Sequence, residues 1–181
     1  MSSGVFVIRK DGKLVEMRQT EYNSENVLQE LLARYPNLLA GNLIDDSNPR
    51  KWLLIQREYG IPDKDEASDR WALDHLFLDQ DGVPTLVEVK RSSDTRLRRQ
   101  VVGQMLDYAA NALHYWDATR IQACYEERCN TNRIDPVEEL IIKLEIEDYD
   151  EYWKRVENNL ETSKIRLLFI ADKIPLELRQ I

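Results

Sequence analysis

The sequence predicts an α/β protein with a central mixed β-sheet and helices on both faces of the sheet. Two strand-like runs, His75–Leu78 and Thr85–Lys90, flank the turn sequence Asp79-Gln80-Asp81-Gly82, which is typical of a hairpin. The longest helical pattern, Thr95–Trp116, follows this hairpin directly. A late apolar run, Ile165–Ala171, indicates a strand in the centre of the sheet. Strands interleaved with helices in this way favour a layered α/β architecture.

Length and composition are those of an ordinary globular chain of one domain. The chain has 181 residues, 43% hydrophobic and 32% charged, with a net charge of −8. No apolar run approaches a membrane span and the start of the chain has no signal-peptide core, so we expect a cytoplasmic protein with no membrane partner. The two cysteines, Cys124 and Cys129, lie five residues apart in a predicted helix, and we expect free thiols there.

The N-terminal part of the chain begins with a hairpin and a helix. Val5–Arg9 and Leu14–Arg18 alternate around Asp11-Gly12 and predict the hairpin. A helix capped by Asn23 or Ser24 is expected to run to about Arg34, because Pro36 follows. Its expected inner face consists of Val27, Leu28, Leu31, Leu32 and Tyr35. Lys51–Tyr59 then reads as a strand, followed by a polar loop over Gly60–Asp69.

The second half of the chain is mainly helical. A helix is predicted from Asp117 or Thr119 to Cys129, and an N-cap and N1 pair, Asp135-Pro136, begins another that runs to about Glu145. An acidic helix follows over Asp148–Leu160. Pro175 opens a last helix in which the sequence stops, which favours a longer natural protein.

Charged residues share one face of the strand Thr85–Lys90. Side chains alternate along a strand, so Leu86, Glu88 and Lys90 point to one face and the intervening residues to the other. If the turn places Leu78 opposite Pro84, Asp74 lies opposite Glu88; a shift of one residue breaks this pairing, and the pattern alone does not decide between them. Two carboxylates and one amine at the end of a hairpin can hold a divalent metal ion and a water molecule.

The following helix carries a polar line beside its apolar stripe. Asp94 is the expected N-cap. The apolar stripe consists of Leu97, Val101, Met105, Ala109, Ala112 and Trp116. The polar line, with successive members four residues apart, consists of Arg96, Gln100, Gln104 and Tyr108.

These residues resemble the motifs of the PD-(D/E)XK nuclease superfamily. Asp74, thirteen residues, and then Glu88-Val89-Lys90 resemble its core motif, and Gln104-Met105-Leu106-Asp107-Tyr108 resembles the QxxxY motif of its RecB-like branch. The stretches Ser24–Gln29 and Tyr35–Leu39 resemble the leading helix of NucS-type members. One departure is that Ala72-Leu73, and not a proline, precedes Asp74; that proline is often missing in the superfamily.

The resemblance covers about Ser24–Trp116, with a fainter echo over Ile165–Leu178, and implies a restriction-endonuclease-like core. On this interpretation the chain 1–181 is one nuclease-like domain. It comprises an N-terminal hairpin (1–20), a nuclease core (21–117 plus 164–172) and an acidic helical segment (126–161).

The resemblance also implies roles for the site residues. Asp74 and Glu88, with the carbonyl of Val89, would bind Mg²⁺ or Mn²⁺, because these hard cations prefer oxygen ligands. Lys90 would orient or deprotonate the attacking water and stabilise charge on the phosphorane. Gln104 and Tyr108 would support the site from the helix. The structural alternatives are a cross-strand polar pair, a surface Glu88–Lys90 ion pair, a solvated Gln104 and a core-edge Tyr108.

Two neighbouring residues are ambiguous. Glu25 either contacts a metal-bound water or is simply an acidic residue that the helix dipole favours at the N-terminus of its helix. The two interpretations carry equal weight. His75 points away from Asp74, so we expect a packing histidine rather than a general base.

The charge distribution separates a basic region from an acidic one. The segment 126–161 holds twelve acidic and five basic residues, so it carries −7 of the net charge of −8. Arg91, Arg96 and Arg99 lie beside the motif and are candidate phosphate contacts, although a solvated charged face is almost equally consistent with them.

The expected function is therefore metal-dependent hydrolysis of phosphodiester bonds in DNA, at branched, flapped or single-stranded sites. The alternative is the same fold without turnover, which would bind nucleic acid or protein. A protein partner at the acidic helices of 126–161, and a homodimer, are further candidates for association.

Overall fold

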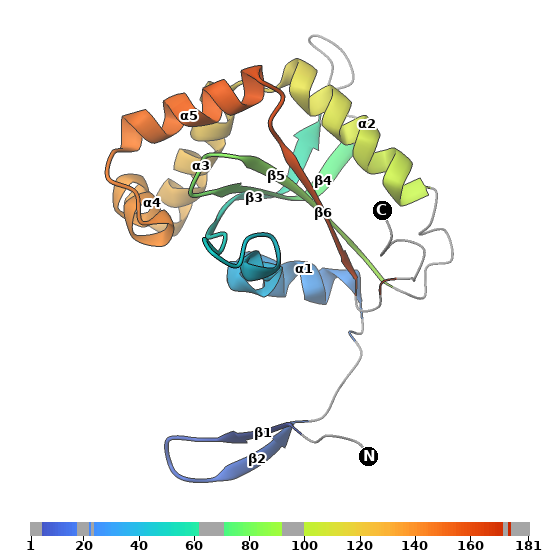
Figure 1. The fold of residues 1–181 in the computed structure, drawn as a ribbon, viewed down its shortest axis with the longest axis vertical. Coiled ribbons are helices and arrows are strands. Elements are labelled where there is room, and N and C mark those ends of the chain that lie inside the picture. Colours follow the sequence, from blue (N-terminus) through green and yellow to red (C-terminus); the bar gives the residue numbers. More distant parts are fainter. Residues whose placement is uncertain are drawn as a thin grey trace.

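Four strands form one mixed sheet at the centre of the protein (Figure 1). The structure is a computed structural model, which describes residues 5–17, 22, 24–61, 71–91, 100–171 and 174. The strands are β3 (Trp52–Ile61), β4 (Trp71–Asp79), β5 (Pro84–Lys90) and β6 (Arg166–Ala171), in this order across the sheet. The pairs β3–β4 and β4–β5 are antiparallel, and β5–β6 is parallel. The predicted mixed sheet is confirmed.

Helices cover both faces of the sheet (Figure 1). One face packs against α1 (Glu25–Arg34) and the 3-10 turn η1 (Pro36–Leu39), which is followed by a second 3-10 turn, η2 (Gly41–Leu43). The opposite face packs against α2 (Gln100–Tyr115), α3 (Ala118–Asn132), α4 (Pro136–Leu144) and α5 (Tyr149–Glu161). The α/β prediction with helices on both faces is therefore confirmed.

The two apolar clusters follow the alternation predicted for β5. Leu86 belongs to the cluster on the side of α2 to α5, whereas Val87 and Val89 belong to the cluster on the side of α1. Glu88 and Lys90 share the parity of Leu86 and so belong to the α2 side.

The predicted helix starts agree with the structure. The side chains of Ser24, Asp117, Asp135 and Asp148 each accept a hydrogen bond from a backbone amide three residues further on, at 2.7 to 3.4 Å. This geometry satisfies amides that have no partner within the helix. The expected N-cap Asp94 lies outside the described residues, as do Leu97 and the final helix that begins at Pro175.

Three expectations about packing were wrong. β6 lies at the edge of the described sheet and is half-buried, because nothing pairs beyond it in sheet order β3-β4-β5-β6. On α1, Val27 and Tyr35 are 39% and 49% exposed, whereas Leu28 and Leu32 are buried. The buried face of α1 is thus narrower than its apolar pattern suggests.

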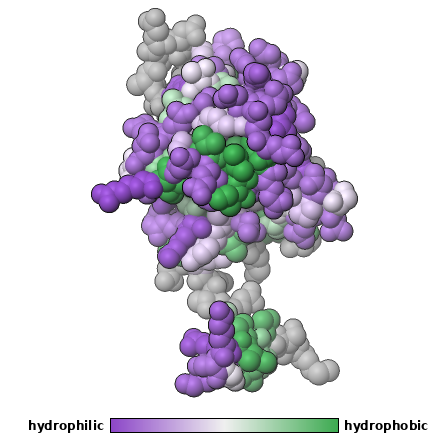
Figure 2. Space-filling model, turned by 90° about the vertical axis from the view of Figure 1, so that its left-hand side faces the viewer, coloured by the Kyte–Doolittle hydropathy of each residue, from purple (hydrophilic) through white to green (hydrophobic). Residues whose placement is uncertain are grey.

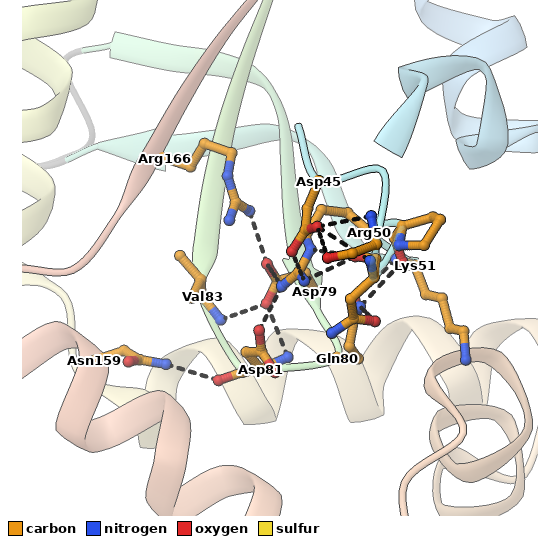
Figure 3. A network of polar contacts seen from close by, with 12 residues as sticks. Asp45, Arg50, Lys51, Asp79, Gln80, Asp81, Val83, Asn159 and Arg166 are labelled. Atoms are coloured by element: carbon orange, nitrogen blue, oxygen red, sulfur yellow. Dashed lines mark hydrogen bonds and ion pairs between the residues drawn. The ribbon is translucent and has the colours of Figure 1, made fainter. Parts of the chain in front are cut away.

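A buried aspartate joins three parts of the fold at the turn between β4 and β5 (Figure 3). Asp79 is fully buried, and its Oδ1 accepts hydrogen bonds from the amides of Asp81 and Val83, both at 3.0 Å. Its Oδ2 accepts a hydrogen bond from Nη1 of Arg166 on β6, at 2.8 Å, and forms an ion pair with Arg50 at 3.8 Å. The network connects the loop before β3, the β4–β5 turn and the edge strand.

The N-terminal hairpin forms a separate two-stranded sheet. Strands β1 (Val5–Ile8) and β2 (Leu14–Met17) pair as predicted, and Figure 1 shows them apart from the four-stranded sheet. Cys124 and Cys129 are half-buried and buried thiols outside any disulfide, as expected. None of the helices described is both long and apolar enough for a membrane span.

Candidate active site

The register of β4 and β5 places Asp74 next to Glu88. The observed pairs run from Leu78↔Pro84 to His75↔Val87, which is one of the two registers that the sequence allows. Continued by one residue, this register sets Asp74 opposite Glu88. The contacts of the two side chains agree: the Asp74 carboxylate reaches the amide next to Glu88, and its charge raises the pKa of Glu88.

Asp74 is held from two sides. Its Oδ2 accepts a hydrogen bond from the backbone amide of Val89 at 2.7 Å, and its Oδ1 accepts one from the side-chain amide of Gln29 at 2.7 Å. Gln29 lies on α1, and its carbonyl Oε1 accepts a hydrogen bond from Nη2 of Arg57 at 3.4 Å. The orientation of Asp74 is therefore fixed jointly by β5 and α1.

Glu88 and Lys90 form an ion pair on the same face of β5. The Lys90 amine lies 2.7 Å from Oε1 of Glu88, with side-chain exposures of 20% and 2% respectively. Gln104 on α2 donates from Nε2 to the same Oε1 at 3.3 Å and also to the hydroxyl of Tyr108. Both amide hydrogens of Gln104 are thereby used, and the QxxxY pair faces the strand motif as predicted.

Burial and mutual repulsion perturb the titration of the cluster. Burial, and then the charge of Asp74, raise the pKa of Glu88; burial likewise raises the pKa of Asp74 against the effect of its hydrogen bonds. Burial alone would lower the pKa of Lys90, but the hydrogen bond and charge of Glu88, aided by Asp74, outweigh it and raise that pKa. Lys90 therefore stays an ammonium group near neutral pH.

Tyr108 is almost fully buried and remains a neutral phenol. Burial raises its pKa, and the hydrogen bond from Gln104 opposes that shift only in part. The core-edge interpretation of Tyr108 and its proposed role at the site are both consistent with this position.

The other predicted residues lie around this cluster or outside the described residues. Glu25 at the start of α1 accepts a hydrogen bond from the backbone amide of Arg91 at 3.0 Å, and its charge acts on both Asp74 and Lys90. Glu25 therefore ties α1 to the end of β5. Arg91 follows that strand directly, whereas Arg96 and Arg99 fall outside the described residues.

The chemistry of the two carboxylates suits a divalent cation. Glu88 Oε2 is buried and has no hydrogen-bond partner among the described residues, which is unfavourable for a carboxylate unless a cation compensates it. Within the same part of the chain, no group of three or more His, Cys, Asp and Glu side chains is placed to hold a metal ion. Mg²⁺ is commonly bound through one or two carboxylates, with water and phosphate oxygens as its other ligands, so Asp74 and Glu88 fit that cation.

His75 packs against the helix rather than joining the site. Its Nε2 donates to the backbone carbonyl of Gln29 at 2.8 Å, and its ring stacks on Phe77. Burial lowers the pKa of His75 to about 4, so the ring is neutral near pH 7. The packing interpretation of this histidine is the one that the geometry supports.

Sequence reasoning missed two features beside Asp74. Gln29 shows no signal beyond its spacing from Glu25 on α1, yet it contacts both Asp74 and the histidine next to it. Glu58 has a left-handed backbone, with φ of 50°, at the position in β3 between the pairs Arg57↔His75 and Tyr59↔Leu73. Such a conformation is unfavourable for a residue with a side chain and is often found near functional sites.

Comparisons with known proteins give no relative from which to infer the function. No protein-family model matches the chain, and neither the curated proteins nor the solved structures contain a significant match.

Proposed function

We propose that the protein is a metal-dependent deoxyribonuclease of the PD-(D/E)XK type. The observation that carries the proposal is the convergence of Asp74, Glu88 and Lys90 from two strands, with Gln104 of α2 bonded to the same carboxylate. The motif residues are separated by up to thirty positions in sequence, and chance matches to short motifs have no reason to meet in space.

Each residue has a defined task in this proposal. Asp74 and Glu88, with the carbonyl of Val89, would hold Mg²⁺ or Mn²⁺, which supplies charge neutralisation and an acidic water molecule. Lys90 is an ammonium group beside Glu88, so it would stabilise negative charge on the attacked phosphate rather than accept a proton. Gln104 fixes the rotamer of Glu88, and Glu25 and Gln29 fix the α1 side of the site.

The position of the acidic helices is compatible with a nucleic-acid substrate. α5 contacts the β4–β5 turn, where Tyr152 and Asn159 donate to the backbone carbonyls of Asp79 and Asp81. Glu88 lies six residues along the chain from Gly82, or roughly 20 Å for extended backbone. α5, which belongs to the acidic segment, therefore packs at the end of the hairpin opposite the motif, where its charge repels phosphate less.

The proposal is tested by cleavage of single-stranded, flapped and duplex DNA with Mg²⁺ or Mn²⁺. Glu88→Gln keeps the shape of the side chain and should abolish cleavage, whereas the matched control Glu138→Gln, an exposed residue on α4, should leave it unchanged. Isothermal calorimetry of Mn²⁺ binding should show the same contrast. Equal cleavage by the wild type and Glu88→Gln, with contaminating nucleases excluded, would overturn the metal site.

One observation favours the second candidate, a binding module without turnover. Both oxygens of Asp74 and one oxygen of Glu88 already have protein partners, so the cluster is partly satisfied without a cation. For that candidate, DNA binding would be retained in Glu88→Gln and neither protein would cleave DNA.

A further inference from the structure

The hairpin β1–β2 exposes most of its apolar side chains. Val5, Phe6, Ile8, Leu14 and Met17 are each more than half exposed, and Ile8 reaches 72%. The pairs Phe6↔Glu16 and Ile8↔Leu14 put three of the apolar side chains on one face, together with a single acid. A lone two-stranded hairpin is marginally stable in water, so this one calls for another surface to cover it.

The body of the protein has a groove beside α4, here called the α4 groove, whose lining mixes apolar and charged side chains. Tyr35, Pro36 and Ile142 line a groove of about 570 Å³, and Ile142 is 66% exposed. Arg34 and Lys143 border the same groove. Figure 2 shows, from the side on which α4 lies in Figure 1, an apolar area on the body and another on the hairpin.

An acidic groove adjoins the α4 groove. It has a volume of about 460 Å³, shares Lys51 and Glu145 with the first groove, and includes three further acids, Glu147, Asp148 and Glu151. The two grooves thus present exposed apolar side chains flanked by basic residues next to an acidic region.

The side chains of the hairpin are complementary to the two grooves. Its strands are apolar and carry one acid on the face in question, Glu16, which suits the borders formed by Arg34 and Lys143. Its turn carries three cations, Arg9, Lys10 and Lys13, against Asp11, which suits the acidic groove.

We propose that two copies of this chain associate, with the Phe6–Ile8–Leu14–Glu16 face of each hairpin docked in the α4 groove of the other copy. The hairpin stands apart from its own body (Figure 1), whereas a second copy presents the same pair of grooves. Reciprocal docking creates two identical contacts related by a twofold axis, so the assembly closes as a dimer. This inference does not depend on the nuclease proposal.

Analytical ultracentrifugation of the full chain tests the proposal with two disrupting variants and one control. Ile8→Asp places a charge on the apolar face of the hairpin, and Ile142→Asp places a charge in the α4 groove. Both positions are exposed, so the fold should survive, as circular dichroism can verify. The matched control Leu106→Asp changes an apolar residue of α2 that is 58% exposed and lies in neither surface. We expect dimers for the wild type and the control, and association at least tenfold weaker for both disrupting variants.

An equimolar mixture of the two disrupting variants identifies the mode of docking. The Ile142→Asp chain keeps an intact hairpin and the Ile8→Asp chain keeps an intact groove, so the mixture should form heterodimers through one of the two contacts. Raising NaCl from about 50 mM to about 500 mM should weaken all association, because the turn and the acidic groove attract through exposed charges. A monomeric wild type, or an Ile142→Asp variant that dimerises like the wild type, would overturn the proposal; the latter result would indicate hairpin–hairpin contact.

Discussion

Gln29 on α1 donates its side-chain amide to Oδ1 of Asp74 on β4, at 2.7 Å, across 45 residues of sequence. In the proposed nuclease, Gln29→Leu would leave Asp74 fixed only by the Val89 amide. Partners that orient a metal ligand typically contribute 10- to 100-fold, and we expect a loss of about that size in metal affinity or kcat/KM. Calorimetry with Mn²⁺ separates this loss from a loss of DNA binding, which should persist.

The neighbouring exposed residue provides the control for Gln29. Glu30→Gln alters a side chain on the same helix that contacts Asn26 rather than the site, and should leave metal affinity unchanged. Equal effects of the two variants would indicate that α1 acts only through its general stability.

Lys90→Met should separate binding from turnover. The substitution keeps much of the side-chain volume and leaves both carboxylates in place, so Mn²⁺ should still bind. If the ammonium stabilises the transition state, kcat should fall by about 10²- to 10⁴-fold. Single-turnover cleavage measures this, with Lys51→Met as the control, since Lys51 pairs with Glu145, the C-cap residue of α4, and not with the site. Unchanged kcat in Lys90→Met would remove Lys90 from the mechanism.

The arginines after β5 are expected to act on DNA affinity alone. Arg96→Ala and Arg99→Ala should each weaken DNA binding and lower the slope of log K against log salt by about 0.7 to 0.9 for each phosphate that is no longer neutralised. Fluorescence anisotropy over a range of NaCl concentrations gives that slope. A slope that does not change would assign both residues to a solvated face, the alternative that the sequence leaves open.

Asp79→Asn should destabilise the fold strongly without touching the proposed chemistry. The substitution leaves Arg50 and Arg166 facing a neutral amide in a region where Asp79 is fully buried. Breaking one partner of a buried ion pair typically costs about 3 to 5 kcal/mol of unfolding free energy. Urea denaturation measures the cost, with Asp81→Asn, whose side chain is 48% exposed, as the control expected to lose far less.

Glu139 should make stability depend on pH. Burial alone would raise its pKa, but the hydrogen bonds from Lys143 and Arg128, at 2.6 and 2.5 Å, outweigh burial and lower that pKa. A depressed carboxyl pKa contributes stability above the ordinary value of 4.5, and this contribution is lost as the pH falls through the folded-state pKa. Glu139→Gln should therefore cost about 1 to 3 kcal/mol at pH 7 and much less in acid. Denaturation at several pH values, with the exposed Glu138→Gln as control, checks both statements.

The register of the central hairpin shows how far sequence patterns reach. The alternation in Thr85–Lys90 correctly predicted which side chains share a face, because a two-residue period is a local property. The choice between two registers needed the turn geometry, since a shift of one residue exchanges the faces. The helix cap at Asp135 was equally predictable, and the caps at Ser24 and Asp117 were each one of two candidates, because a cap bonds to its own next turn.

The order of the strands and the contacts of Gln29 were long-range relationships that sequence patterns did not predict. The apolar run that forms β6 looks like a central strand, yet it forms the edge of the described sheet, since the run specifies burial and not the order of strands. Gln29 carries no signal of its own, because an amide on a half-exposed helix position is compatible with solvent. The left-handed backbone of Glu58 could not be predicted either, because only glycine or asparagine at that position would have indicated a positive φ.

The parallel pairing of β5 with β6 also bears on how the chain is synthesised. Thr85 and its partner Arg166 are separated by 81 residues, so the antiparallel β4–β5 hairpin can form long before its second neighbour exists. At 5 to 20 residues per second, the ribosome needs roughly 4 to 16 s to make that interval. During this time β5 presents an unpaired edge rich in β-branched residues, a template for mispairing with other nascent chains. More abundant chaperones during synthesis should therefore raise the yield of folded protein, because they cover this edge until β6 has been made.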